Sequence, residues 1–336
     1  MASAASSPPS YFPRVSVVVP IYNGEQDLPG LLRCLRAQTY PADKVEYLLV
    51  DNGSRDRTPQ LLSIAAGEFA TAGLTFEFLS ETDIQSSYAA RNKGICAATG
   101  DFIAFTDADC YPKPHWLSEL IQPFQSDTVG IVAGEIAALP GNTLLERYAE
   151  KEEMLSQQHT LNHVFGPYGQ TANVAIRMAA FEQVGLFRPY LTTGGDADIC
   201  WRIQREGHGP HGLWQIEYAP QATVQHRHRK TIKGLYAQWY RYGKSNRYLH
   251  DLHGIALSNP LPKKEENRTL LKWLLRDLPQ AVIILLFQRR VAVEKLVAPV
   301  ANLYCARARD QGQKEAVLPE AAREKVFYPV SATTGQ

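Results

Sequence analysis

Apolar and polar positions follow two different periods along the first part of the chain. Short apolar runs predict strands over Val15–Pro20, Val45–Val50, Leu74–Leu79 and Asp101–Thr106. Between them, apolar residues at helical spacing predict helices over Leu28–Gln38, from Thr58 onward, and over Ser87–Ala98. This alternation predicts an α/β fold with a doubly wound, mainly parallel sheet that helices cover.

The alternation of strand and helix patterns becomes less regular after Leu139. The pattern predicts a polar helix over 143–158, irregular glycine-bearing segments over 165–212, and helices over about 268–286 and 291–309. Basic residues flank apolar faces in these last helices, so they could pack on the rest of the chain, form a homodimer, or lie on a membrane. The apolar run Ala281–Phe287 is too short to span a bilayer, and we expect no transmembrane helix.

Composition and charge limit the class of protein. The chain has 336 residues, 45% hydrophobic and 21% charged, which predicts a globular protein. The net charge of +1 argues against a nucleic-acid partner. The 5 cysteines contain no C-x-x-C pair, which indicates reduced thiols and a cytoplasmic location. No signal peptide is predicted, because no basic region precedes an apolar core.

Two carboxylates follow a strand in the stretch FIAFTDADCYP. Asp107 and Asp109 are two positions apart, so extended geometry would point both the same way. Carboxylate oxygens suit Mg²⁺ or Mn²⁺ bound together with substrate phosphates. The alternative is a solvated turn before the next helix, predicted near 112–122. The position after a strand, where ligands bind in such sheets, favours the metal site.

Loops rich in turn-forming residues follow the first two strands. Asp51 comes directly after the second predicted strand, where a carboxylate can bind a ribose or base. The alternative is that Asn23-Gly24 and Asn52-Gly53 are only tight turns.

Four ordered segments resemble glycosyltransferase family 2, whose members have the GT-A fold. They are VSVVVPIYNGEQDLPGLLRCLRAQTYP, YLLVDNGSRDRT, AARNKGICAATGDFIAFTDADC and GGDADICWRI. The resemblance covers roughly Val15 to Tyr242. It implies a metal-dependent (Mn²⁺ or Mg²⁺), inverting transfer of one sugar from a UDP-, GDP- or dTDP-sugar to an acceptor hydroxyl. The acceptor would be a sugar, a lipid-linked compound or a small molecule in glycoconjugate biosynthesis.

The resemblance also implies a domain organisation. We expect a disordered lead-in (1–14), a nucleotide-sugar-binding half (15–138), an acceptor-binding half (139–258), a C-terminal helical extension (259–315) and a flexible tail (316–336). The helical extension could hold the protein peripherally at the inner face of a membrane.

Donor-side and metal-side roles carry over by the same resemblance. The expected nucleotide contacts are Pro20, Tyr22, Asn23, Asp51, Asn52, Gly53, Arg91 and Asp107. The expected metal ligands are Asp109, Asp107 and His226. The alternative for His226 is a surface histidine in a basic strip.

A carboxylate must take the proton of the acceptor hydroxyl in such a transfer. Asp196 matches the second acid of the Glu-Asp pair in the family and is the predicted base. The chain departs from the family here, because Gly195 stands where the family often has Glu. Asp198 is the second candidate base; its alternative role is to stabilise a helix N-terminus.

The remaining candidates lie on the acceptor and diphosphate sides. Acceptor-side candidates are Gln170, Asn173 and Trp201, although Asn173 could instead satisfy loop backbone. Diphosphate-side candidates are Arg227, Arg229, Gln238 and Arg241, from a basic helix-forming stretch. Gln238 to Arg241 resembles the Q-x-x-R-W motif of polysaccharide synthases, with Tyr242 in place of Trp. The GHGPHG segment, Gly207–Gly212, lacks the strand-before-helix context of a dinucleotide fingerprint and is predicted to be a loop.

Two other functions remain open from the sequence. A nucleotidyltransferase would usually have a basic first loop, and Pro20–Asp27 contains no basic residue. A non-catalytic carbohydrate-binding protein of the same fold is compatible with Gly195.

Overall fold

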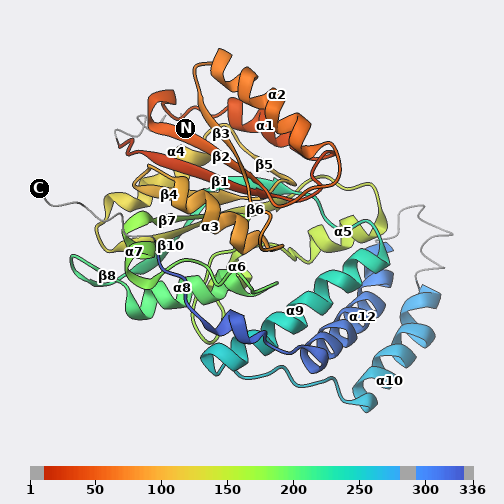
Figure 1. Ribbon diagram of the computed structural model, residues 1–336. Coiled ribbons are helices and arrows are strands. Elements are labelled where there is room, and N and C mark those ends of the chain that lie inside the picture. The colour runs from red at the N-terminus through yellow and green to blue at the C-terminus, as the bar shows by residue number, and fades with distance from the viewer. Residues whose placement is uncertain (1–10, 281–292, 329–336) are drawn as a thin grey trace, which may run out of the picture. The chain divides into compact units, whose positions relative to one another are not determined.

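A mixed eight-stranded sheet is the centre of the computed structural model, which describes residues 11–280 and 293–328 (Figure 1). The strand order is β3-β2-β1-β4-β7-β6-β10-β5. The strands are β1 (Val15–Ile21), β2 (Val45–Asp51), β3 (Thr75–Ser80), β4 (Phe102–Thr106), β5 (Cys110–Pro112), β6 (Val129–Ala138), β7 (Asn173–Arg177) and β10 (Gln215–His226). The described residues divide into two compact units, and the sheet belongs to the first, residues 11–136, 156–226 and 320–328.

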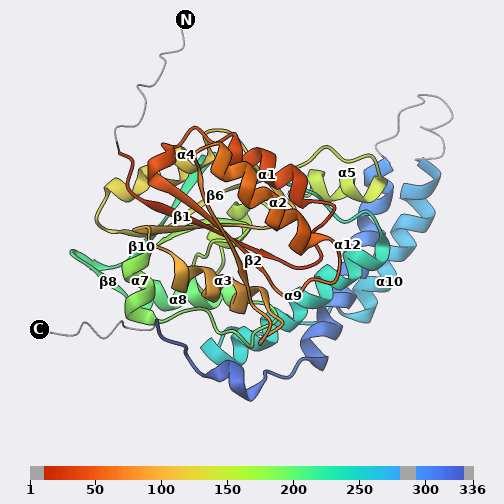
Figure 2. The same ribbon diagram turned by 45° about the horizontal axis from the view of Figure 1, so that its top comes forward.

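Strands β1 to β4 form the parallel part of the sheet, as predicted. Val15 of β1 pairs with Val45 of β2 on one side and with Phe102 of β4 on the other. Every residue of β1 is buried, because helices cover both faces of the sheet. Figures 1 and 2 show α1, α2 and α4 on one face and α3, α7 and α8 on the other. These helices span Leu28–Arg36 (α1), Thr58–Thr71 (α2), Ser87–Ala97 (α3), Trp116–Ile121 (α4), Met178–Val184 (α7) and Gly195–Glu206 (α8).

The other part of the sheet is antiparallel, and the sequence pattern did not show it. Strand β7 pairs antiparallel with both β4 and β6, and β10 pairs antiparallel with β5. Strand β7 and helix α7 lie in the segment 165–212, which was expected to be irregular. The GHGPHG segment forms a small hairpin, β8 (His208–Gly209) with β9 (Gly212–Leu213), where a loop was predicted. Short antiparallel strands are easily missed because each has too few residues to show a period.

The second unit, residues 137–155 and 227–319, is helical in its described part. It contains α5 (Leu144–Lys151), α9 (Ile232–His253), α10 (Lys263–Lys272) with a π-helical continuation Trp273–Asp277, and α12 (Val293–Glu315). Tyr148, Leu235 and Cys305 are buried together in its core. Helices α9 and α12 cross closely, since a Cβ on Gly243 would lie 1.9 Å from the Arg309 carbonyl oxygen. The predicted helix 143–158 is in fact two helices, α5 and α6 (Gln157–Leu161).

The compact units divide the chain differently from the predicted boundaries. The described part of the predicted flexible tail is packed: Ala322 is buried, and the Leu186 amide donates to the Val326 carbonyl at 2.7 Å. The lead-in 1–10, the apolar run Ala281–Phe287 and residues 329–336 lie outside the described residues. Within the described ranges, no helix combines the length and apolarity required to cross a bilayer.

Candidate active site

A cavity of about 480 Å³ opens where β1, β2 and β4 end. Seven of the residues predicted from the sequence line it: Pro20, Tyr22, Asn23, Asn52, Arg91, Asp107 and Asp109. They come together because the carboxyl ends of parallel strands meet at one edge of the sheet.

The loops after β1 and β2 hold each other through hydrogen bonds. Asn23 has a left-handed backbone conformation, with φ 50°. Its side-chain oxygen accepts from the Arg55 backbone amide at 2.8 Å, and its backbone amide donates to Ser54 Oγ at 2.8 Å. The Asp51 carboxylate is buried and accepts from the Ser54 amide at 3.2 Å. Gly53 has φ 74°, which suits a glycine in a tight turn. These loops therefore form tight turns, and the turns are compatible with a ligand-binding role for the residues that line the cavity.

Asp107 and Asp109 lie on the turn between β4 and β5, not on an extended strand as predicted. The Cys110 amide donates to the Asp107 carbonyl at 3.0 Å and closes this turn. Both carboxylates still line the cavity. Arg91 Nη2 on α3 contacts Asp107 Oδ1 at 2.6 Å. Burial raises the pKa of the Asp107 carboxyl and the Arg91 guanidinium opposes this, while the charges of Asp109 and Asp196 raise it further.

His226 is brought to Asp109 by strand pairing. Strand β10 pairs with β5 in a register that places His226 opposite Cys110. As a result His226 Nε2 lies 3.3 Å from Asp109 Oδ1, and the histidine is buried. A surface position for His226, the alternative left open by the sequence, is therefore wrong.

The residues around Asp109 fit a divalent cation. One ligand atom each from Asp109, Cys110 and His226 lies within 4.8 Å of the others. Carboxylate oxygen and imidazole nitrogen are donors that suit Mn²⁺, whereas a thiol is a soft ligand that suits other metals. Asp107, on the same turn, offers a further carboxylate at the cavity wall. Among the described residues, Asp109 and His226 therefore fit a divalent ion, with Asp107 beside them on the turn.

Asp196 is held in place by two neighbours that the sequence did not indicate. The Thr171 amide donates to its carboxylate at 3.2 Å, and the Thr171 hydroxyl donates at 3.1 Å. The Asp196 carboxylate also accepts from the Tyr88 hydroxyl, whose pKa is raised by burial and by the charge of Asp196. The Tyr88 hydroxyl therefore stays protonated and able to donate.

The ring of Tyr88 explains why residue 195 is glycine. A Cβ on Gly195 would lie 2.6 Å from Tyr88 Cζ, so no side chain fits there. The Gly195 amide donates to the Tyr88 hydroxyl at 2.9 Å. The phenol thus occupies the space in which the Glu of the family pattern would stand. The glycine at position 195, which differs from the family pattern, therefore makes room for Tyr88, a residue distant in the sequence.

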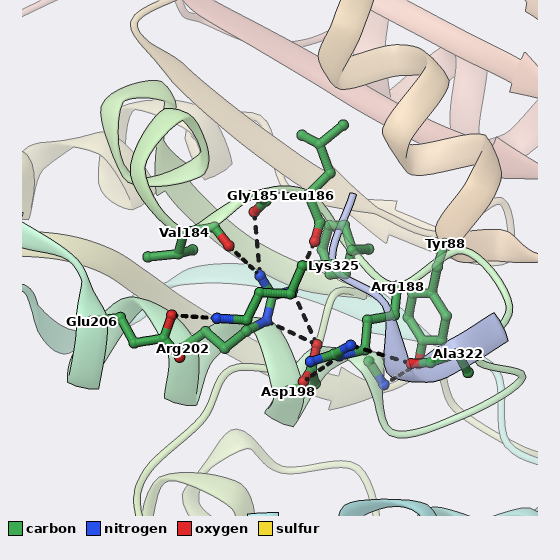
Figure 3. Close-up of polar contacts among 12 residues, drawn as sticks. Tyr88, Val184, Gly185, Leu186, Arg188, Asp198, Arg202, Glu206, Ala322 and Lys325 are labelled. Carbon is green, nitrogen blue, oxygen red and sulfur yellow. Dashed lines mark hydrogen bonds and ion pairs between the residues drawn. The ribbon is translucent and has the colours of Figure 1, made fainter. Parts of the chain in front are cut away.

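Asp198 is a structural residue, and its assignment as a candidate base is wrong. Its side chain is fully buried between Arg188 and Arg202, as Figure 3 shows. Arg188 Nε lies 3.1 Å from one carboxylate oxygen, and Arg202 Nη2 lies 3.0 Å from the other. The Arg202 guanidinium also donates to the Val184 and Leu186 carbonyls, each at 2.7 Å. A carboxylate enclosed in this way cannot reach an acceptor hydroxyl.

Replacing Asp198 by Ala is expected to destabilise the fold by about 3–5 kcal/mol, because it leaves buried arginine charge unpaired. Urea unfolding measures the loss. The matched control is Glu68→Ala, which breaks the exposed ion pair between Arg36 and Glu68 and should cost less than about 1 kcal/mol. Equal losses in the two variants would contradict the structural role.

Two of the three residues predicted on the acceptor side, Asn173 and Trp201, are core residues in the structure. Asn173 is fully buried; its amide donates to the carbonyls of Glu135 and Ala222, and its oxygen accepts from Trp116 Nε1 at 2.7 Å. Trp201 lies on the buried side of α8, and its Nε1 donates to the Gly166 carbonyl at 2.9 Å. Both therefore hold the core together. Gln170 is half-buried; its backbone amide donates to Gln157 Oε1 at 2.9 Å, and its carbonyl accepts from Gln157 Nε2 at 3.3 Å.

The diphosphate-side candidates belong to the second unit. Arg229 and Arg241 line a groove of about 610 Å³ with Tyr236 and Tyr240 between α9 and α12. Gln238 Nε2 donates to the Tyr242 hydroxyl at 3.0 Å. Ile232, the first residue of α9, is 60% exposed. The role of Arg227, Arg229, Gln238 and Arg241 stays a prediction.

Comparisons with known proteins match the chain to one family. Residues 16–185 match the family model "Glycosyl transferase family 2", and residues 102–300 match "Glycosyl transferase family group 2". Glycosyltransferase AglE of Haloferax volcanii is 36% identical over 206 residues, which cover 59% of this chain and 64% of that protein. The pre-mycofactocin glycosyltransferase of Mycobacterium tuberculosis is 29% identical over 290 residues, 83% of this chain and 57% of that protein. The chain thus spans less than two thirds of these relatives.

Solved structures share the fold. A mannosyltransferase of Pyrobaculum calidifontis, in complex with GDP-Man and Mn²⁺, superposes with a TM-score of 0.60 at 18% identity. The match covers 94% of this chain and 92% of that one. Glucosyl-3-phosphoglycerate synthase of Mycobacterium tuberculosis has a TM-score of 0.50 at 19% identity, over 73% and 82% of the two chains.

Proposed function

The chain belongs to glycosyl transferase family 2 and has the GT-A fold, and on this premise we propose that it moves a single sugar from a nucleotide diphosphate sugar to an acceptor hydroxyl. We propose further that the transfer is metal-dependent and inverts the anomeric carbon. The mannosyltransferase of the same fold was solved with GDP-Man and Mn²⁺, which supports a nucleotide-sugar donor and a divalent ion.

The observation that carries the proposal is one cluster of charges at the cavity. These charges come from helix α3 (Arg91), the turn between β4 and β5 (Asp107 and Asp109), helix α8 (Asp196) and strand β10 (His226). The charges of Arg91, Asp109, Asp196 and His226 all act on the pKa of the Asp107 carboxyl. A metal-binding turn and a separate half-buried carboxylate are the two acidic functions that the reaction requires.

Each residue has a distinct task in the proposed reaction. Asp107, Asp109 and His226 would hold the divalent ion, which would neutralise charge on the departing diphosphate. Asp196 takes the proton of the acceptor hydroxyl as its oxygen bonds to the anomeric carbon. The bond from that carbon to the diphosphate breaks, and its electron pair leaves with the nucleotide. Attack from the side opposite the leaving group inverts the configuration.

Calorimetric titration of the full chain with UDP-, GDP- and dTDP-sugars tests the donor proposal. We expect one of these donors to bind in the presence of Mn²⁺ or Mg²⁺, and to bind at least about 10-fold more weakly with chelator, because the ion would supply the positive charge that offsets the repulsion between the acidic side chains and the diphosphate. Equal affinity with and without metal would contradict metal dependence. If no donor binds under either condition, the sugar-transfer proposal itself fails.

A further inference from the structure

Helix α10 and its continuation to Asp277 turn their apolar side away from the unit they belong to. The partly buried positions are Glu266, Thr269, Trp273 and Asp277, a mostly polar stripe, and Glu266 binds Arg307 of α12 at 2.8 Å. The leucines are exposed instead: Leu270 at 36%, Leu271 at 57%, Leu274 at 53% and Leu275 at 67%. An ordinary amphipathic helix turns its apolar side toward the core and its polar side toward solvent.

The exposed leucines form one continuous face. Positions i, i+1, i+4 and i+5 lie on the same side of a helix, so the four side chains are neighbours. Scattered single leucines on a surface are common, whereas a contiguous apolar face usually marks a binding surface. We call Leu270, Leu271, Leu274 and Leu275 the leucine face.

A basic row borders the leucine face. Arg268, Lys272 and Arg276 follow at intervals of four residues, so they lie along one edge of it, and all three are exposed. Two of the neighbouring acids are already paired, Glu266 with Arg307 and Asp277 with Arg276 Nε at 2.8 Å. The outward surface is therefore apolar and bordered by positive charge.

We propose that α10 lies flat on an anionic lipid surface, with the leucine face among the acyl chains and the basic row at the headgroup phosphates. An apolar face edged by Lys and Arg is typical of helices that lie in the plane of a membrane interface. Protein interfaces, by contrast, are depleted in lysine near their apolar centre, and Lys272 is three positions before Leu275 and therefore neighbours it on the helix surface. Helix α10 and its continuation, Lys263–Asp277, reach about 22 Å, less than the roughly 30 Å of a bilayer core, which fits a helix that lies on the surface.

Flotation of the full chain with lipid vesicles tests this surface. We expect binding to vesicles of phosphatidylcholine mixed with phosphatidylglycerol, weaker binding to pure phosphatidylcholine, and a decrease at high salt, because salt screens the basic row. The double variant Leu271→Ser/Leu275→Ser should lower vesicle partitioning about 10-fold or more. Lys272→Glu/Arg276→Glu should remove the preference for phosphatidylglycerol.

The matched control is Ile64→Ser on α2, which removes a side chain that is 59% exposed on the other unit. It should leave vesicle binding unchanged, and circular dichroism should show all variants folded. Unchanged binding by the leucine variant would overturn the proposal. So would a dimer, detected by light scattering, that the leucine substitutions dissolve in a chain that ignores vesicles; that result would assign the face to a second copy. Lipid binding and sugar transfer are separate properties, so either can fail alone.

Discussion

Replacing Asp196 by Asn is expected to lower the turnover number by about 10²–10⁴-fold, the usual contribution of a general base. The amide is nearly isosteric with the carboxylate and can keep hydrogen bonds to the Thr171 amide and hydroxyl. It cannot accept the proton of the acceptor hydroxyl. Donor affinity should therefore be unchanged, which calorimetry and steady-state kinetics on the same preparation will show.

Two further variants separate the base from its surroundings. Tyr88→Phe removes the hydroxyl that binds both Asp196 and the Gly195 amide but keeps the ring. Because Tyr88 only positions the base, kcat should fall by less than in Asp196→Asn, with donor affinity unchanged. Tyr47→Phe removes another buried hydroxyl, which binds the Leu35 carbonyl, and should leave kcat unaltered. Full activity of Asp196→Asn would reject this residue as the base.

The second large effect is expected at the other side of the cavity, where Asp109→Ala should abolish the metal-dependent part of donor binding. Several kcal/mol of transition-state stabilisation depend on such an ion, so turnover should fall about 10³-fold or more. His226→Ala should weaken the metal response less, because a carboxylate carries the charge that attracts the cation. Titration with Mn²⁺ at fixed donor concentration measures both.

The control for these variants is Asp43→Ala, an exposed acid in the 3-10 turn before β2. It should respond to Mn²⁺ like the wild-type chain. The two large effects are also distinguishable from each other, since Asp109→Ala loses donor binding and Asp196→Asn keeps it. Metal-independent turnover that survives in Asp109→Ala would contradict the metal assignment.

The part of the cavity at the ends of β1, β2 and β4 was predictable because most of its residues follow strands of the parallel half. Asp107, Asp109 and Asn52 come directly after β4 and β2, so strand prediction alone places them at one edge. Arg91 was placed only by resemblance, and the ion pair with Asp107 now gives it a physical reason.

The residues that hydrogen-bond to Asp196 could not be predicted from the sequence around them. Tyr88 and Thr171 approach Asp196 from other elements, and nothing in their own neighbourhood in the sequence marks them. Asn173 and Trp201 were misassigned for the converse reason: a polar or aromatic side chain near a motif looks functional, while its burial is a tertiary property. Asp198 has the same type of side chain as the candidate base and lies two residues from it, but its ion pairs with Arg188 and Arg202 give it a structural role.

The pairing of β10 with β5 also has a consequence for the order of folding. His226 is the last residue of β10 and meets Asp109 only when that strand adds to the edge of the sheet. The loops after β1 and β2 can form earlier, from nearby parts of the chain. Contacts between residues distant in sequence form slowly, because a long loop must close first. During synthesis we therefore expect the loops after β1 and β2 to form before the His226 imidazole reaches Asp109.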